Sequence, residues 1–277
     1  MSKNKMNTAL DFMLNMYFGL KLSDLSGEKW TENVLDKAII LSYDDATRQG
    51  AFNTRVDRTE LSAEKLDSIK EKGIKILKDS FKPKNGESIS LSEKCGDYIV
   101  WHENVCKELA ENFQDIKRKN DQGTPAFTIG NAQKWVNMTI KNLYILLSVK
   151  KMIGEDGGDS VLKTLINSDE NDCHVPIDNY LLQYAFHPKT GDDKAKRIGN
   201  ESNNDQIWIL KETETQYKVR LNDNEYVAWS NISTYDDYEK IQEALRECLL
   251  SSELLEGNIL DKENAAWIEI KTLRKNA

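Results

Sequence analysis

The sequence is poor in the residues that build disulfide-linked or metal-bound domains. It has four cysteines and three histidines in 277 residues, and no two cysteines form a C-x-x-C pair. The adjacent Cys173 and His174 supply only two of the four ligands that a structural zinc needs. His102 and Cys106 stand one helical turn apart, with no further ligand at a fitting spacing. We therefore expect free thiols, a core-edge position for His102, and no metal or other cofactor.

Long apolar runs and the common catalytic motifs are also missing. Asp11 and Asn15 interrupt the apolar residues near the N-terminus, so we expect neither a signal peptide nor a membrane-spanning helix. Together with free thiols, this favours a cytoplasmic protein. The glycine-rich nucleotide loops, the H-E-x-x-H zinc motif and the G-x-S-x-G elbow are absent, which leaves those chemistries without support.

The sequence has fewer basic residues than acidic ones. Lys and Arg number 38 against 46 Asp and Glu, which gives a formal net charge of −8. Because phosphate contacts need basic side chains, this balance counts against a nonspecific nucleic-acid binder unless basic residues gather on one face. Six Trp, ten Tyr and seven Phe are more aromatic residues than a disordered chain carries, so a folded core is expected.

Apolar residues recur at helical spacing through most of the chain. We expect helices at 7–22, 30–41, 61–77, 91–113, 131–153 and 235–250. Ser62 and Asp178 are expected to cap helix N-termini, and Ser233 followed by two aspartates is typical of a helix start. Residues 254–273 are expected to form a last helix or a strand. Polar composition predicts a loop at 44–59, a linker at 117–126 and a flexible stretch at 187–205.

The hydrophobic period changes to two in the tract 206–229. Short apolar runs there alternate with turn residues, which predicts two or three antiparallel strands. The expected fold class is therefore mainly α (α+β), a helical bundle with a small antiparallel β element. Residues 1–277 form a single mostly helical domain or two lobes, 1–116 and 127–277.

One segment, 127–141, places a glycine-containing turn directly before an apolar helix. Lys134 stands in the first turn of that helix, four residues after Gly130. Backbone N–H groups at a helix start can bind a phosphate, and burial together with the helix dipole favours the nucleophilic free amine of a lysine. The rigid Pro176 can aim Asp178 at the same pocket.

These residues resemble the helix-hairpin-helix DNA glycosylases, most closely the archaeal 8-oxoguanine glycosylases. In that family a hairpin glycine stands four residues before the nucleophilic lysine, as Gly130 does before Lys134. A second lysine one heptad on is matched by Lys141. A Pro-(Val/Ile)-Asp tripeptide is matched by Pro176, Ile177 and Asp178, and the resemblance covers residues 127–185 only.

The resemblance implies a helix-hairpin-helix-like core in the C-terminal lobe and damaged duplex DNA as the partner. Lys134 would attack the sugar C1′ and form a Schiff base, and Asp178 would stabilise charge at the departing base and sugar. The damaged base would be flipped into a pocket lined by aromatic residues such as Trp135 or Tyr144. Gln133 would offer an amide to that base or to a phosphate.

Other interpretations remain open. A related fold that has lost the chemistry carries the same residues, and so can an unrelated helical protein in which Lys134 and Lys141 face solvent. The alternative function is a noncatalytic interaction protein of a bacterial stress or phage-defence assembly, which the acidic charge and the many aromatic residues favour.

The two functions differ in what they predict. A glycosylase needs a basic groove beside Lys134, formed by Lys141, Lys150 and Lys151 or Arg197. An interaction protein needs a conspicuous apolar patch or a self-associating face. Whether Lys134 and Asp178 share a pocket does not follow from the sequence, nor do the substrate base, the oligomeric state and the pathway.

Overall fold

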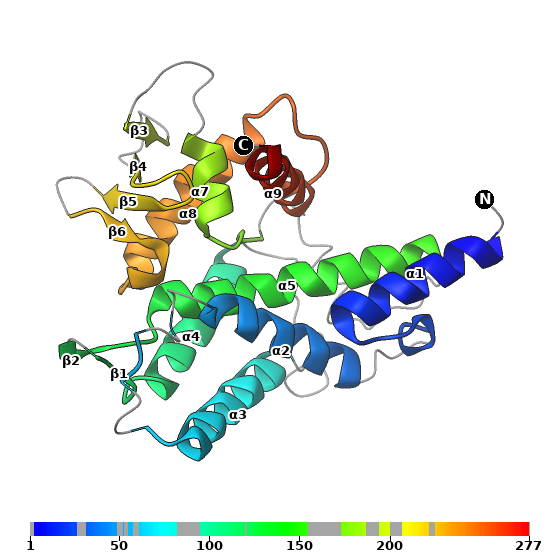
Figure 1. The fold of residues 1–277 in the computed structure, drawn as a ribbon, viewed down its shortest axis with the longest axis horizontal. Helices are drawn as coiled ribbons and strands as arrows, with labels where there is room; N and C mark the ends of the chain where they lie inside the picture. Colours follow the sequence, from blue (N-terminus) through cyan, green and yellow to red (C-terminus); the bar gives the residue numbers. More distant parts are fainter. Residues whose placement is uncertain are drawn as a thin grey trace.

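The computed structural model describes residues 3–26, 32–48, 52, 55–57, 61–81, 95–119, 121–154, 173–186, 194–199, 207–221 and 225–276. Within these residues the fold is mainly helical with two small antiparallel sheets, as the sequence predicts (Figure 1). Of the described helices, none has the length and apolarity that crossing a bilayer requires.

The expected helices are all present. Helix α8 has the expected bounds and the others have shifted ends, while residues 91–94 of the expected fourth helix lie outside the described residues. The α-helices are α1 (Lys3–Phe18), α2 (Glu32–Thr47), α3 (Ala63–Ser80), α4 (Cys95–Asn112), α5 (Ile129–Met152), α7 (Asn179–Phe186), α8 (Tyr235–Leu250) and α9 (Ile259–Asn276). Two short 3₁₀ helices are η1 (Leu22–Asp24) and η3 (Trp229–Asn231). The tract 254–273 therefore contains a helix, not a strand. Ser62 caps α3 as expected, whereas α8 is capped by Thr234 and not by Ser233.

The expected strands in the tract 206–229 are also present. The larger sheet has the antiparallel order β3-β4-β5-β6, formed by Ala195–Ile198, Ile207–Lys211, Tyr217–Leu221 and Val227–Ala228. The expectation of an irregular stretch at 187–205 was wrong for β3, whose Lys196 and Arg197 pair with Ile209 and Trp208. The remainder of that stretch, 187–193 and 200–205, lies outside the described residues.

Two polar segments that were expected to be irregular are ordered by long-range contacts. Residues 117–126 contain the hairpin of β1 (Lys117–Arg118) and β2 (Asp121–Pro125), where a linker was expected. Arg118 pairs with Val56 and donates from Nε to the Pro125 carbonyl at 3.1 Å. Helix α2 also continues through Thr47 into the expected loop at 44–59.

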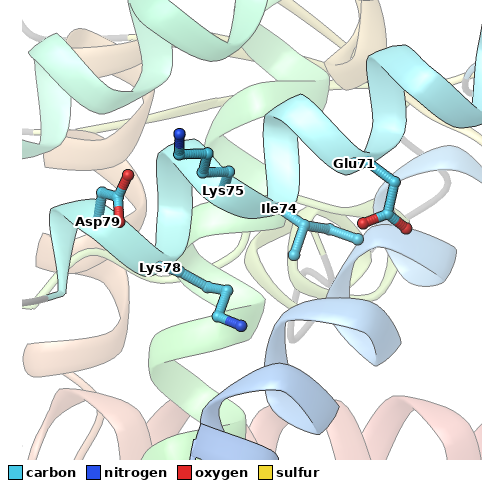
Figure 2. A pocket seen from close by; sticks show the side chains of 5 residues that line it. All are labelled: Glu71, Ile74, Lys75, Lys78 and Asp79. Carbon is cyan, nitrogen blue, oxygen red and sulfur yellow. The ribbon is translucent and has the colours of Figure 1, made fainter.

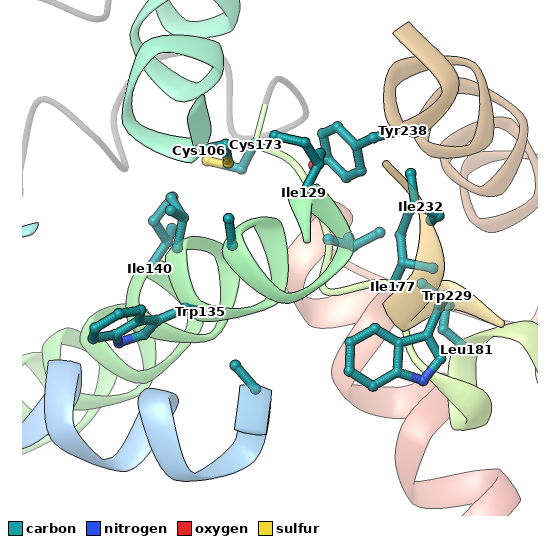
Figure 3. Packing of buried hydrophobic residues seen from close by; sticks show 14 of the residues in the cluster. Cys106, Ile129, Trp135, Ile140, Cys173, Ile177, Leu181, Trp229, Ile232 and Tyr238 are labelled. Atoms are coloured by element: carbon teal, nitrogen blue, oxygen red, sulfur yellow. The ribbon is translucent and has the colours of Figure 1, made fainter. Parts of the chain in front are cut away.

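Helix α5 runs through the middle of the molecule. Helices α2, α3 and α4 lie on one side of it, and α7, α8, α9 and the larger sheet lie on the other (Figure 1). The Trp135 side chain points toward α2 and is fully buried, with Nε1 donating to the Ile39 carbonyl at 2.9 Å (Figure 3). A Cβ on Gly73 would lie 2.8 Å from the Trp135 ring, which explains a glycine inside the apolar stripe of α3.

The start of α5 is fixed by the backbone of η3. Thr128 caps the helix and exchanges hydrogen bonds with Asn131. The Gly130 N–H donates to the Ile232 carbonyl at 2.9 Å, and a Cβ on Gly130 would lie 2.0 Å from the Trp229 carbonyl oxygen. Helix α4 reaches α5 through the β1–β2 hairpin and not through a tight turn, so a helix-hairpin-helix core is not shown by the described residues.

Candidate functional site

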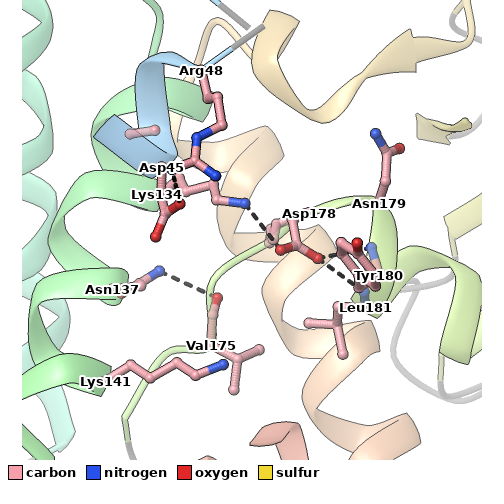
Figure 4. Close-up of polar contacts among 12 residues, drawn as sticks. Asp45, Arg48, Lys134, Asn137, Lys141, Val175, Asp178, Asn179, Tyr180 and Leu181 are labelled. Atoms are coloured by element: carbon pink, nitrogen blue, oxygen red, sulfur yellow. Dashed lines mark hydrogen bonds and ion pairs between the residues drawn. The ribbon is translucent and has the colours of Figure 1, made fainter. Parts of the chain in front are cut away.

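Lys134 and Asp178 meet at the junction of α5 and α7. Their Nζ and Oδ2 atoms lie 2.9 Å apart across 44 residues of sequence, and the side chains are only 10% and 9% exposed (Figure 4). The second carboxylate oxygen, Oδ1, accepts the backbone N–H groups of Tyr180 and Leu181, so Asp178 also caps α7. Asp178 was expected as an N-cap, and this expectation is confirmed.

The surroundings of Asp178 favour its charged form. Burial by itself raises the pKa of the carboxyl. The Lys134 charge, the Leu181 N–H and the Lys141 charge outweigh burial and hold the pKa of Asp178 below its ordinary value. At neutral pH the group is therefore a carboxylate.

An aromatic ring covers the other side of the lysine. The Lys134 Nζ lies 4.9 Å from the centre of the Trp229 ring, within the range of a cation–π contact. Trp229 belongs to η3, whose backbone is packed on Gly130. The close approach at Gly130 therefore places an indole ring directly beside the amine.

A second ion pair lies one heptad along the same face of α5. Lys141 Nζ and Glu263 Oε2 of α9 are 2.5 Å apart, and both side chains are buried. Burial raises the pKa of Glu263, and the adjacent Lys141 charge offsets only part of this effect. Sequence reasoning missed Glu263, although it stands on the buried stripe of α9 between Ile259 and Ala266, where a charged residue is unusual.

A half-buried aromatic pair adjoins both ion pairs. The rings of Tyr180 and Trp267 are 4.9 Å apart. The buried Lys141 Nζ lies 5.9 Å from the Trp267 ring, and the Lys271 Nζ lies 4.3 Å from the same ring. Arg274 lies 4.2 Å from the Tyr180 ring. The pair thus joins the buried charges to basic groups at the surface of α9.

The structure gives Gly130 and Gln133 internal partners. The Gly130 N–H is bonded to Ile232, so this amide is not open to a phosphate. The Gln133 amide is fully buried and donates from Nε2 to the carbonyls of Gly130 at 2.9 Å and Ile177 at 3.4 Å. In this conformation neither residue presents a free group to a ligand.

Trp135 and Tyr144 are not brought beside Lys134. The Trp135 ring packs between α2 and α4 against Tyr43 and Phe113. Tyr144 stands ten residues beyond Lys134 on α5, about 15 Å along the helix. Its hydroxyl donates to Asp261 Oδ1 at 2.9 Å. The aromatic residues that do adjoin the lysine–carboxylate pairs are those described above.

The basic residues expected to form a groove are dispersed. Lys141 is paired with Glu263, and Lys150 is 1% exposed. Lys151 is exposed near the far end of α5, and Arg197 lies on β3 with its guanidinium 6.0 Å from the Trp208 ring. A groove built from these four side chains beside Lys134 is therefore not seen.

Other arginines cluster near the start of α5. Arg55 Nη1 donates to the Ser230 carbonyl at 3.1 Å, and Arg118 Nη2 donates to Asn231 Oδ1 at 3.3 Å. Burial and the neighbouring Arg118 charge lower the pKa of Arg55 to about 10. Figure 4 also draws Arg48, which directly follows α2 and lies 3.9 Å from Asp45 Oδ1. Positive charge therefore gathers around η3 in an otherwise acidic chain.

Two further features offer no site of their own. A hollow along α3 is lined by Glu71, Ile74, Lys75, Lys78 and Asp79, and its Lys78 forms a 2.7 Å ion pair with Asp36 (Figure 2). Among the described residues, no group of three or more His, Cys, Asp and Glu side chains could hold a metal ion.

Comparison of the chain with protein-family models, with curated proteins and with solved structures gave no match.

Proposed function

We propose that this chain binds damaged DNA and removes a base with Lys134 as the nucleophile and Asp178 as its partner. The observation that carries the proposal is the buried 2.9 Å pair between the two side chains. Their 44-residue separation and their different helices make the contact a product of the fold. A lysine held against a carboxylate and an aromatic ring has the components of an amine nucleophile with a proton acceptor.

In the proposed reaction, the protons move only among Lys134, Asp178 and the substrate. The Lys134 ammonium gives a proton to Asp178, and the freed amine attacks C1′. The bond from C1′ to the base breaks with its electron pair on the base, which takes a second proton from Nζ. The bond from C1′ to O4′ then breaks, Asp178 returns its proton to O4′, and an imine links C1′ to Lys134. Water hydrolyses the imine and restores the lysine.

The surroundings supply contacts for an extruded nucleotide. Trp229, Tyr180 and Trp267 offer ring faces beside the two buried lysines, and base stacking on such rings is worth about 1–3 kcal/mol per base. Lys271 and Arg274 offer positive charge next to the rings. Because Lys134 is 10% exposed, the proposal requires neighbouring side chains to move before the sugar reaches Nζ.

The test is covalent trapping with borohydride. Purified protein is incubated with duplex oligonucleotides carrying 8-oxoguanine, uracil or an abasic site, and the adduct is read on a denaturing gel. We expect an adduct with the wild type, none with Lys134→Met, and a strongly slowed reaction with Asp178→Asn. Lys141→Met is the matched control, since it removes a buried, ion-paired lysine from the same face of α5. An adduct that survives Lys134→Met would contradict the proposal.

A second candidate, a noncatalytic interaction protein, is favoured by α1. Its exposed face carries Phe12, Met13, Met16 and Tyr17, each between 48% and 65% exposed. Spacings of four residues pair Phe12 with Met16 and Met13 with Tyr17 in two adjacent rows, and such an apolar patch is typical of interaction surfaces. Light scattering tests this candidate: it predicts association that Phe12→Glu with Met16→Glu abolishes. A strict monomer that gives a Lys134-dependent adduct would contradict it.

A further inference from the structure

The residues before Asp178 are held by buried side-chain amides. Gln133 accepts the Ile177 N–H through Oε1 at 3.4 Å and donates to the Ile177 carbonyl through Nε2 at 3.4 Å. Asn137 donates to the Val175 carbonyl at 3.2 Å (Figure 4). One side chain of α5 thus satisfies both backbone groups of the residue that directly precedes Asp178.

Gln133 and Lys134 are consecutive in α5, and they contact two residues that are consecutive at the start of α7. Gln133 directly precedes Lys134 on α5, and Ile177 directly precedes Asp178 at the start of α7. The Gln133–Ile177 contact is therefore the immediate neighbour of the Lys134–Asp178 contact in both elements. Fixing the first contact fixes how far α7 can shift along α5, and this shift sets the separation of Nζ and Oδ2.

A chain of buried hydrogen bonds orients the Gln133 amide. The carbonyl oxygen of Asn137 accepts from His102 Nε2 at 2.9 Å, so Nε2 carries the proton and Nδ1 accepts from the Tyr235 hydroxyl at 2.8 Å. The Asn137 amide then donates to Gln133 Oε1 at 3.1 Å. This leaves Gln133 Nε2 to face the carbonyls. His102, expected at the edge of the core, is fully buried within it.

The chain offers a matched control in Gln242 of α8. In the amide orientation that satisfies both partners, Gln242 donates to the Val175 carbonyl at 3.0 Å and accepts the Val175 N–H at 2.8 Å. Gln242 is 1% exposed and Gln133 is fully buried. The two glutamines make the same kind of contact with one segment, but only Gln133 holds the residue next to Asp178.

We propose that Gln133 is a positioning residue, which sets the Asp178 carboxylate against Lys134 through the backbone of Ile177. Its amide contacts protein groups on both sides, and this positioning role differs from the substrate contact that the sequence leads us to expect. The effect on base removal rests on the proposed function, whereas the effect on the ion pair does not.

The experiment compares Gln133→Met with Gln242→Met in the full chain. Carbon-13 NMR of the carboxyl groups is followed through a pH titration, with the Asp178 signal assigned by its loss in Asp178→Asn. We expect Gln133→Met to raise the pKa of Asp178 toward its ordinary value, because the lysine is no longer held at contact distance. We expect Gln242→Met to leave that pKa unchanged. Equal shifts in the two variants, or no shift in either, would overturn the proposal.

A second variant keeps the proposal testable if Gln133→Met does not fold. Gln133→Asn keeps an amide in the core but is one methylene too short to bridge to Ile177, and we expect the same direction of change. Trapping with borohydride then separates the two proposals. We expect Gln133→Met to slow adduct formation at least tenfold with little change in half-saturating DNA, since small misplacements of reacting groups are costly. If the wild type forms no adduct, the proposed function fails and the titration alone decides the role of Gln133.

Discussion

The Asp178 carboxylate binds the Lys134 ammonium with one oxygen at 2.9 Å and caps helix α7 with the other. The aspartate therefore has no oxygen without a partner. It cannot turn away from the lysine without weakening the start of α7. The pair is thus both a structural link between α5 and α7 and a preorganised arrangement of an amine and a carboxylate.

We predict that Asp178→Asn destabilises the fold because it leaves the buried Lys134 charge without a counter-ion. Asparagine is a good N-cap, so the substitution retains the cap and removes the charge. Losing one partner of a buried pair costs about 3–5 kcal/mol. The double variant Lys134→Met, Asp178→Asn should recover a large part of that loss. Urea unfolding of the single and double variants measures both effects, and additive losses would contradict the prediction.

We predict that Gly130→Ala lowers stability by about 1–3 kcal/mol, the cost of overpacking. Replacing an exposed glycine inside a helix by alanine usually stabilises the protein, by up to about 1 kcal/mol. Here the new methyl group would lie 2.0 Å from the Trp229 carbonyl oxygen and displace η3. The sign of the change in unfolding free energy distinguishes the two cases. The same variant should also alter Trp229 fluorescence, since the ring would leave Lys134.

We predict that stability falls as the pH is lowered from about 6.5. Burial lowers the pKa of His102 to about 3 and that of His174 well below its ordinary value. The unfolded chain therefore binds protons at these residues that the folded chain excludes, and folding weakens as the pH drops below the unfolded value. His102→Gln should reduce the slope of unfolding free energy against pH between about pH 4 and 6. The reduction should correspond to the uptake of about one proton fewer on unfolding. An unchanged slope would contradict this assignment.

We predict that Lys271→Ala weakens duplex DNA binding across sequences and lowers its salt dependence by about one counterion. Lys271 is exposed and lies over the Trp267 ring, which adjoins the Lys141–Glu263 pair. Lys151→Ala is the control, because Lys151 is an exposed lysine near the far end of α5. Binding titrations at several salt concentrations measure both the affinity and its salt dependence. Equal losses in the two variants would show that this surface has no special part in DNA binding.

Helical periodicity predicted most of the fold because helices such as α3 and α8 bury one apolar face. The cap at Asp178 followed from the sequence in the same way. Strand β3 escaped prediction because Ala195–Ile198 has little apolar character and is ordered by pairing with β4. The β1–β2 hairpin escaped for a similar reason, since contacts from distant residues such as Val56 order it.

The candidate site was predicted in part. The sequence left open whether Lys134 and Asp178 share a pocket, and the structure brings the two side chains into contact. The aromatic neighbours were not foreseen, because Trp135 and Tyr144 lie on faces of α5 that sequence spacing alone does not orient. Trp229, Tyr180 and Trp267 reach the lysines only through the packing of η3, α7 and α9.

Peptide mapping of the trapped adduct shows which lysine is the nucleophile. Wild-type protein is reduced with borohydride on duplex DNA that carries the damaged base, digested, and sequenced by mass spectrometry. The prediction is a reduced sugar remnant on Lys134 Nζ, with Lys141 unmodified in the same digest. A remnant on other lysines, or on exposed lysines in proportion to their accessibility, would contradict it.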